Sequence, residues 1–153
     1  MRWLAVTSTA GLTIPSNSVI RDVAEASNGS TYILGLREGR NPQDWGMLLM
    51  QADLNPDIQN EELGFDSYCI STTPENAIFY GGVSRCELTH TYLKIEFSEK
   101  AAAALNVPQL ITFQLEVSEK QILLVRKGLQ RVLTSGRFEE RPSPLSLGLS
   151  DVS

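Results

Sequence analysis

The sequence predicts an α+β fold, in which a largely antiparallel sheet carries helices packed on one face. Residues 92–97 alternate between apolar and charged side chains, which is typical of a strand with one face in water. The β-prone runs within residues 64–98 follow one another through very short connections, and such connections join antiparallel neighbours. An apolar stripe at helical spacing follows Ser118 and supplies the longest helix.

Eight runs have the composition of strands, and in chain order they cover residues 19–26, 31–37, 45–51, 68–71, 77–83, 84–88, 92–97 and 110–117. Asn28-Gly29 favours a tight type I′ hairpin turn between the first two runs. The third run is apolar at nearly every position, which indicates a central strand, with a buried helical turn as the alternative. The four runs within residues 64–98 predict one antiparallel meander, with Gly81-Gly82 at a bend or bulge in its middle.

Three helices are expected, over residues 56–63, over residues 99–105, and from the Ser118 cap to about residue 134. Asn55-Pro56 supplies an N-cap followed by proline at the first helical position. Ser98 is the N-cap expected for the second helix. Ser118 and Gln121 have the spacing of a capping box, in which each side chain satisfies a backbone amide of the other.

The length of 153 residues suits a single domain. We expect a flexible N-terminal arm over residues 1–18, an α+β domain over residues 19–136 and a flexible C-terminal tail over residues 137–153. No apolar run is long enough to predict a transmembrane span, and the apolar start of the chain is too short for a secretion signal. These features predict a cytoplasmic protein.

The net charge of −5 is concentrated in one half of the chain. Residues 55–99 hold eight acidic and two basic side chains, whereas residues 100–153 hold five acidic and seven basic ones. A direct nucleic-acid ligand is disfavoured, because neutralising phosphates requires a basic surface. The acidic half is either a solvated surface or an electrostatic docking surface for a basic partner.

No catalytic residue, metal site or cofactor is expected from the motifs. The single histidine, His90, lies in a predicted turn, and Cys69 and Cys86 lack the C-x-x-C spacing of a zinc site. The two cysteines are expected to be buried, reduced thiols, although strands of one meander could bring them close together. Gly81-Gly82 lacks the lysine and the helix start of a phosphate-binding loop.

The order of many weak signals nevertheless resembles a known family. Those signals include Leu63-Gly64-Phe65-Asp66, Tyr80-Gly81-Gly82-Val83, Glu87-Leu88, the alanine-rich helix 101–105 and Gly128-Leu129. Together they resemble the immunity protein 10 family of bacterial polymorphic toxin systems over residues 19–136. The resemblance implies an α+β immunity protein that binds a cognate toxin domain and blocks it without chemistry. Members tend to have an Asp/Gly-type turn where this chain has Thr89-His90-Thr91, so a wider hairpin is expected here.

The resemblance maps no binding residues onto this chain, so the expected partner-binding residues come from charge alone. They are Asp57, Glu61, Glu62, Asp66, Glu75 and Glu87. The expected partner is a toxin domain with a basic, nuclease-like surface, bound by a monomer or homodimer of this chain. No membrane partner is expected.

Two alternatives to an immunity protein remain at this point. An accessory or small-molecule-binding domain would have a pocket lined by Trp45, Met47 and Tyr80. An enzyme would need His90 or Cys69 in a cleft beside a carboxylate.

Overall fold

The computed structural model describes residues 12–27, 31–51, 67–135, 142 and 145–147. The strands and helices of these residues are β1 (Asn17–Ile20), β2 (Asp22–Ser27), β3 (Tyr32–Arg37), β4 (Gly46–Met50), β5 (Cys69–Thr73), β6 (Ala77–Tyr80), β7 (Val83–Leu88), β8 (Tyr92–Phe97), α2 (Glu99–Leu105), β9 (Leu110–Leu115), α3 (Glu119–Leu133) and β10 (Leu145–Ser146). The predicted helix 56–63 and the Asn28-Gly29 turn lie outside the described residues.

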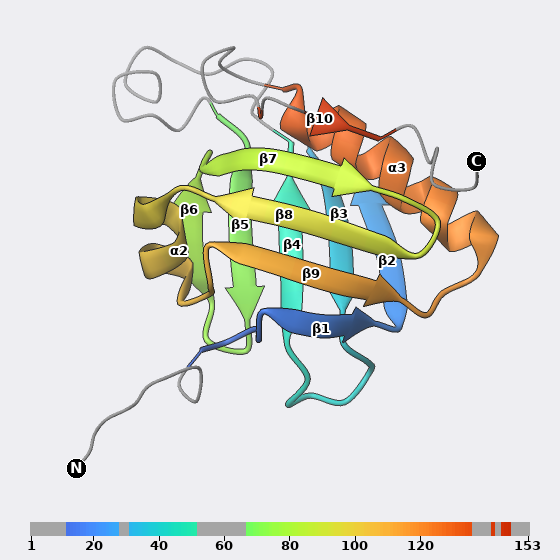
Figure 1. Cartoon of the computed structure of the whole chain (residues 1–153), viewed down its shortest axis with the longest axis horizontal. Coiled ribbons are helices and arrows are strands. Elements are labelled where there is room, and N and C mark those ends of the chain that lie inside the picture. Colours follow the sequence, from blue (N-terminus) through green and yellow to red (C-terminus); the bar gives the residue numbers. More distant parts are fainter. Residues whose placement is uncertain (1–11, 28–30, 52–66, 136–141, 143–144, 148–153) are drawn as a thin grey trace.

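The strands form two five-stranded sheets. Sheet A has the order β1-β9-β8-β7-β10, and sheet B has the order β2-β3-β4-β5-β6. Neighbouring strands are antiparallel except for the parallel pairs β1–β9 and β10–β7. In Figure 1 the strands of sheet A run across those of sheet B. The α+β class and the mostly antiparallel pairing are therefore confirmed, but the strands are divided between two sheets where the sequence suggested one.

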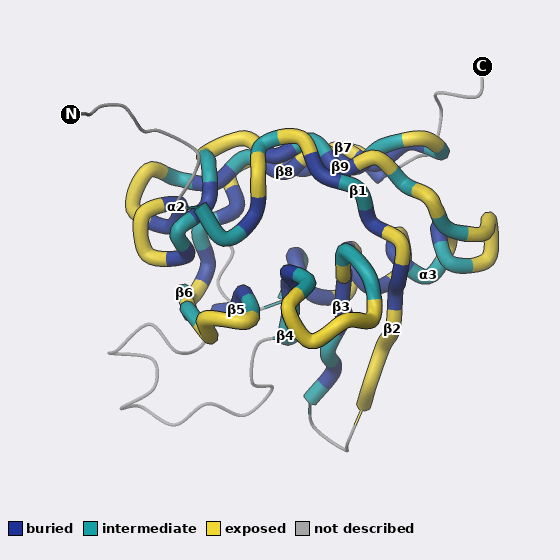
Figure 2. The backbone as a smooth tube through the Cα atoms, turned by 90° about the horizontal axis from the view of Figure 1, so that it is seen from below, coloured by how far each residue is buried: buried dark blue, intermediate teal, exposed yellow. Residues whose placement is uncertain are grey.

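The hydrophobic core fills the space between the two sheets, as the buried backbone in Figure 2 shows. Both helices lie at the sides of this layer, α2 beside β6 and α3 beside β2 and β3. Sheet A and the helices therefore cover the same face of sheet B. Gly128 of α3 allows a close approach to that face, because a Cβ atom there would lie 2.8 Å from Tyr32 Oη and 2.9 Å from Leu34. The central position predicted for residues 45–51 is confirmed, since β4 is the middle strand of sheet B.

The chain changes sheets at Arg21. The sequence predicted a single strand over residues 19–26, but β1 ends at Ile20 in sheet A and β2 starts at Asp22 in sheet B. The Arg21 amide donates to the Arg37 carbonyl of sheet B, while the Ile20 carbonyl accepts from Glu116 beside sheet A. A corner of this kind does not interrupt the run of β-prone residues along the chain. The composition of residues 19–26 therefore could not reveal that they are divided between two sheets.

A second sheet change occurs at Gly81-Gly82, and it overturns the predicted single meander. β5 and β6 pair in sheet B, whereas β7 and β8 pair in sheet A, so β6 and β7 are not neighbours. Both glycines have positive φ angles, +76° and +96°, which glycine adopts without steric cost. The Gly82 carbonyl accepts from Ser98, and the phenol of Tyr68 accepts from the Val83 amide. The predicted bend is thus a crossing between the two sheets.

The predicted starts of the second and third helices are confirmed. The Ser98 side chain accepts from the Ala101 amide at the start of α2, and Ser118 and Gln121 form the reciprocal capping box of α3. α2 ends at Asn106, whose left-handed conformation (φ +58°) lets its amide reach the last carbonyls of the helix.

The segments predicted as arms contribute to the fold where they are described. Ile14 is fully buried, and the Thr13 amide donates to the Asn106 carbonyl. Within the predicted C-terminal tail, Leu145–Ser146 form β10 beside β7, and the Leu147 carbonyl accepts from Arg126 at 2.7 Å. These residues of the predicted arm and tail therefore contact the α+β domain. Residues 1–11 and most of the tail lie outside the described part.

Replacing Gly82 with alanine tests whether the chain needs a glycine at the point where it crosses from sheet B to sheet A. A Cβ atom there would lie 2.5 Å from Ala101 Cβ and 2.9 Å from the Phe79 ring, on a backbone with φ +96°. We expect Gly82→Ala to lower the free energy of unfolding by about 2–4 kcal/mol in urea titrations, from overpacking and backbone strain together.

Gly35→Ala is the matched control, because its added Cβ would make only an ordinary 3.4 Å contact with Leu48. This variant should stay within about 1 kcal/mol of the wild type. Equal stability of the two variants would contradict the role given to the crossing.

Candidate partner-binding surface

The six acidic residues predicted to bind a partner are only partly placed by the structure. Asp57, Glu61, Glu62 and Asp66 lie outside the described residues. All four belong to the segment 52–66, which joins β4 to β5 and carries five acidic and no basic side chains. The described residues carry ten acidic and ten basic side chains. The net charge of −5 therefore equals the charge of this one segment, since the remaining stretches balance.

Glu75 and Glu87, the other two, do not share a surface. Glu75 lies in the turn between β5 and β6 of sheet B, where its carboxylate accepts from the Thr13 hydroxyl at 2.7 Å. This turn is at the opposite end of β5 from the segment 52–66. Glu87 projects from β7 of sheet A. The structure therefore separates the predicted acidic cluster into at least two places.

Glu87 belongs to the outer face of sheet A, which is polar and largely self-paired. It accepts from the Tyr92 phenol at 3.2 Å and lies opposite Lys94 across the β7–β8 pair. Arg85 and Glu96 form an ion pair at 3.6 Å. A depression of about 470 Å³ opens here, lined among others by these four charged residues of β7 and β8, by Leu110 and by Ser146. Charges that already have partners, in equal numbers of each sign, describe an ordinary solvated face.

The outer face of sheet B has the opposite character. Two rows of side chains cross all five strands there, and we call them the apolar rows. The first row comprises Ala24, Gly35, Leu48, Ser71 and Ile78. The second row comprises Ala26, Ile33, Met50, Cys69 and Tyr80. Serine and the tyrosine phenol are the only hydroxyl groups in the two rows, and no charged side chain occurs in them.

The apolar rows were missed because charge guided the search for a binding surface. A signal was present in the sequence: residues 45–51 are apolar at successive positions, so both faces of that strand are apolar. This pattern correctly placed β4 at the centre of sheet B, but it was interpreted as burial on both sides. In the structure Met47 and Leu49 are fully buried on the inner face, while Leu48 and Met50 on the outer face are partly exposed.

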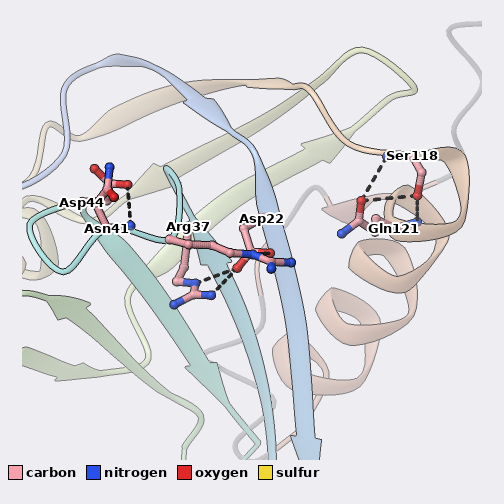
Figure 3. A network of polar contacts seen from close by, with 7 residues as sticks. Asp22, Arg37, Asn41, Asp44, Ser118 and Gln121 are labelled. Atoms are coloured by element: carbon pink, nitrogen blue, oxygen red, sulfur yellow. Dashed lines mark hydrogen bonds and ion pairs between the residues drawn. The ribbon is translucent and has the colours of Figure 1, made fainter.

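Beside the first row, on β2 and β3, a buried carboxylate lies between two arginines, and Figure 3 shows its contact with Arg37. The Asp22 side chain is 8% exposed and forms ion pairs with Arg37 and, at 3.4 Å, with Arg40. Burial alone would raise the pKa of Asp22, but the hydrogen bonds and charges of Arg37 and Arg40 hold this pKa below its usual value. The arrangement ties β2, β3 and the following loop together.

Both thiols are buried, Cys86 in the core between the sheets and Cys69 on the outer face of sheet B. Cys69 and Cys86 are free and buried, on β5 of sheet B and β7 of sheet A respectively. Burial raises the pKa of the Cys69 thiol to about 11, against a hydrogen bond with Tyr80 that lowers it. Burial and the charge of Glu87 raise the pKa of Cys86 to about 12. Within the described ranges, no three His, Cys, Asp or Glu side chains lie close enough together to hold a metal ion.

The pocket considered for a small molecule is not formed by the residues named for it. Trp45 is 5% exposed, with its ring 5.5 Å from that of Phe113, and Met47 is fully buried in the same core. Tyr80 lies on the opposite face of sheet B. The three side chains therefore do not line a common cavity.

Comparison with known proteins connects these surfaces to a family. The family model described as Immunity protein 10 matches residues 19–123, from β1 into α3. No curated protein matches the chain. Among the described residues, no helix is long and apolar enough to cross a membrane.

Removing the charge of Asp22 tests whether its ion pairs with Arg37 and Arg40 stabilise the fold. Because the pKa of Asp22 is lowered by folding, its ionised form stabilises the fold above the unfolded-state pKa of about 3.9, and this contribution disappears as the pH falls toward the lower native value. Asp22→Asn should therefore be about 1–2 kcal/mol less stable than the wild type at pH 7, with the difference shrinking below about pH 4.

Urea unfolding at several pH values measures this effect, with Glu116→Gln as the control. The Arg21–Glu116 ion pair is exposed, with side chains 53% and 59% accessible, so its loss should cost less than about 0.5 kcal/mol. If the difference in unfolding free energy between Asp22→Asn and the wild type did not change with pH, the stabilising role given to the ionised carboxylate would be contradicted.

The two thiols should be unreactive in the folded protein. At pH 8 the raised pKa values leave almost no thiolate, and burial blocks the reagent. We expect a disulfide reagent such as dithionitrobenzoate to label both cysteines at least about 100-fold more slowly in buffer than in denaturant. Cys69→Ala and Cys86→Ala show which cysteine reacts at which rate, and complete labelling of the native protein within minutes would contradict the burial of the two thiols.

Proposed function

Because this chain belongs to the Immunity protein 10 family, whose model matches residues 19–123, we propose that it binds a cognate toxin domain of a bacterial polymorphic toxin system and blocks it. The family match is the observation that carries this proposal. We assign the activity to the domain over residues 19–136 and place it in the cytoplasm, where an antidote meets a toxin that has entered or is made in the cell.

The proposed mode of action is occupation of the toxin rather than chemistry. Both thiols are buried and have raised pKa values, and the carboxylates of Glu87 and Glu96 on sheet A are engaged in a hydrogen bond and an ion pair. An inhibitor of this kind needs a rigid surface of complementary shape and charge. Two packed sheets joined by one core provide such rigidity.

The charge distribution supports a basic toxin surface. All of the excess negative charge can be assigned to the segment 52–66, which includes Asp57, Glu61, Glu62 and Asp66. Concentrated charge accelerates encounter with an oppositely charged partner and favours one orientation of it. A nuclease domain, whose substrate is polyanionic, would present such a basic surface. Glu75 and Glu87 are not part of this segment and do not share a surface with each other, so we assign them no more than a peripheral contribution.

Charge reversal tests this proposal. The triple variant Asp57→Lys, Glu61→Lys and Glu62→Lys should bind the toxin domain encoded beside the gene about 10-fold or more weakly at low salt, and its affinity should depend less on salt than that of the wild type. Co-expression measures protection of the cell, and calorimetry over a salt series measures affinity.

The control is the triple variant Glu116→Lys, Glu139→Lys and Glu140→Lys, which changes the net charge by the same amount outside the segment. Equal effects of the two triple variants would show that only net charge matters. Absence of any binding or protection by the wild type would refute the immunity function itself.

A further inference from the structure

We propose that the free edge of β2 in sheet B accepts an additional strand from the toxin domain, so that sheet B continues into the partner. This inference rests on the proposed immunity function and specifies which backbone of this chain contacts the toxin. It does not depend on the charge of the segment 52–66, because every group that it uses belongs to β2, β3 or α3.

Among the described residues, the two sheets have four edge strands, which differ in length and in what lies beside them. β10 has two residues, and β1 and β6 have four each, whereas β2 has six. α2 packs beside β6. Short edges and edges beside a helix offer little backbone to a partner strand. β2 is therefore the edge on which an added strand can form the longest ladder of hydrogen bonds.

The backbone of β2 has one side without a neighbouring strand in the described part of the chain. β3 pairs with all six residues from Asp22 to Ser27 in one unbroken register. The backbone of these residues makes no other backbone hydrogen bond with a described residue. Because the amide and carbonyl groups alternate in direction along a strand, half of them point away from β3. These outward groups can pair with an added strand as they would within a sheet.

The second half of β2 is exposed on both faces of the strand. Ala24, Glu25, Ala26 and Ser27 are all exposed, although successive residues of a strand point to opposite faces. Figure 2 shows this half of β2 in yellow at the periphery of the molecule, next to β3. β2 contains no proline, lysine or bulge, which are features that commonly protect an edge strand from pairing. The small side chains of three of these four residues leave room for a neighbouring strand.

The side chains beside this edge identify the chemistry of the added strand. On the inner face, Glu25 accepts from the Tyr32 phenol at 2.7 Å and lies 3.6 Å from the Lys127 ammonium group. Arg131 lies over the Tyr32 ring, 4.5 Å from its centre. Lys120 is on the same side of α3, because it precedes Lys127 by about two helical turns. Three cations against one carboxylate leave the inner side of the edge positively charged.

An added strand therefore fits best when it turns an acidic side chain toward α3, where Lys127 is 61% exposed. A second copy of this chain fits poorly, although its β2 could pair with this one about a two-fold axis. That axis would place both α3 helices on the same side of the joined sheet, with their cations facing each other. In the register centred on Glu25, this carboxylate would also lie opposite its own copy. The occupant is therefore a strand of the toxin domain with acidic side chains, and it is a different part of the toxin from the basic surface proposed above.

Hydrogen exchange of the β2 amides tests strand addition directly. We expect the outward amides of residues 24–27 to exchange rapidly in the free protein. In the complex with the toxin domain encoded beside the gene, they should exchange about 10-fold or more slowly, because the added strand accepts from them. The amides of β1 (Asn17–Ile20), an edge of the other sheet, are the matched control and should not change. Unchanged exchange at β2 in a formed complex would overturn the proposal while leaving the immunity function intact.

Charge reversal tests the acidic character of the added strand. Lys127→Glu should weaken toxin binding about 10-fold or more in calorimetry, because a carboxylate would replace a cation beside the edge. Lys100→Glu on α2 changes the net charge by the same amount and should stay within about threefold of the wild type. Circular dichroism with thermal unfolding checks that each variant is folded, and Lys120→Glu replaces Lys127→Glu if that variant is not. Equal losses for the α3 and α2 variants, or wild-type affinity of the folded α3 variant, would overturn the proposal.

Pairing of the edge with a second copy of this chain would give a different result. If the amides of residues 24–27 are protected in the absence of toxin, and this protection increases with protein concentration, the edge is occupied by a second copy and the proposal is overturned. Failure of the wild type to bind any neighbour-encoded toxin domain is distinct from both results, because it removes the immunity function on which the inference rests.

Discussion

The apolar layer shared by the two crossed sheets is the constraint on which the rest of the structure depends. Each sheet has one apolar face that must be covered, and the inner face of sheet B is covered by sheet A together with the two helices. α2 and α3 fill the remaining sides of the layer, which explains the close approaches at Gly82 and Gly128. Because the inner faces are buried in this way, contact of either sheet face with another molecule involves an outer face.

The two outer faces differ in a way that has a physical cost. On sheet A, Arg85 and Glu96 form an ion pair, Glu87 accepts from Tyr92, and Lys94 lies over the Tyr92 ring. On sheet B, Ile78 is 50% exposed and Leu48 is partly exposed, and apolar side chains gain nothing from contact with water. Removing such a surface from water upon binding contributes free energy in proportion to its area, about 25 cal/mol per Å².

Much of the local structure could be predicted from sequence, because local rules act over a few residues. Ser98, Ser118 and Gln121 identify helix starts without any knowledge of the fold. Alternation likewise showed which side chains of residues 92–97 turn inward. The same alternation could not show that the chain crosses from one sheet to the other at Gly81-Gly82. Alternation shows which face of a strand is apolar, but it does not show which strand is its neighbour.

The candidate site was harder to predict for the same reason. Charge along the chain identified an acidic region, but Glu75 and Glu87 are distributed over two sheets that the sequence had merged into one. The apolar rows join residues from 24 to 80, and their common feature appears only when the register of five strands is known.

The most direct test of this account is an NMR titration of the folded protein with the toxin domain encoded beside its gene. The account predicts that the amide signals of Ala24, Ala26 and Ser27 on β2 shift or broaden on complex formation, while those of Asn17 and Val19 at the edge of sheet A do not change. Perturbation confined to the amide signals of sheet A would contradict it.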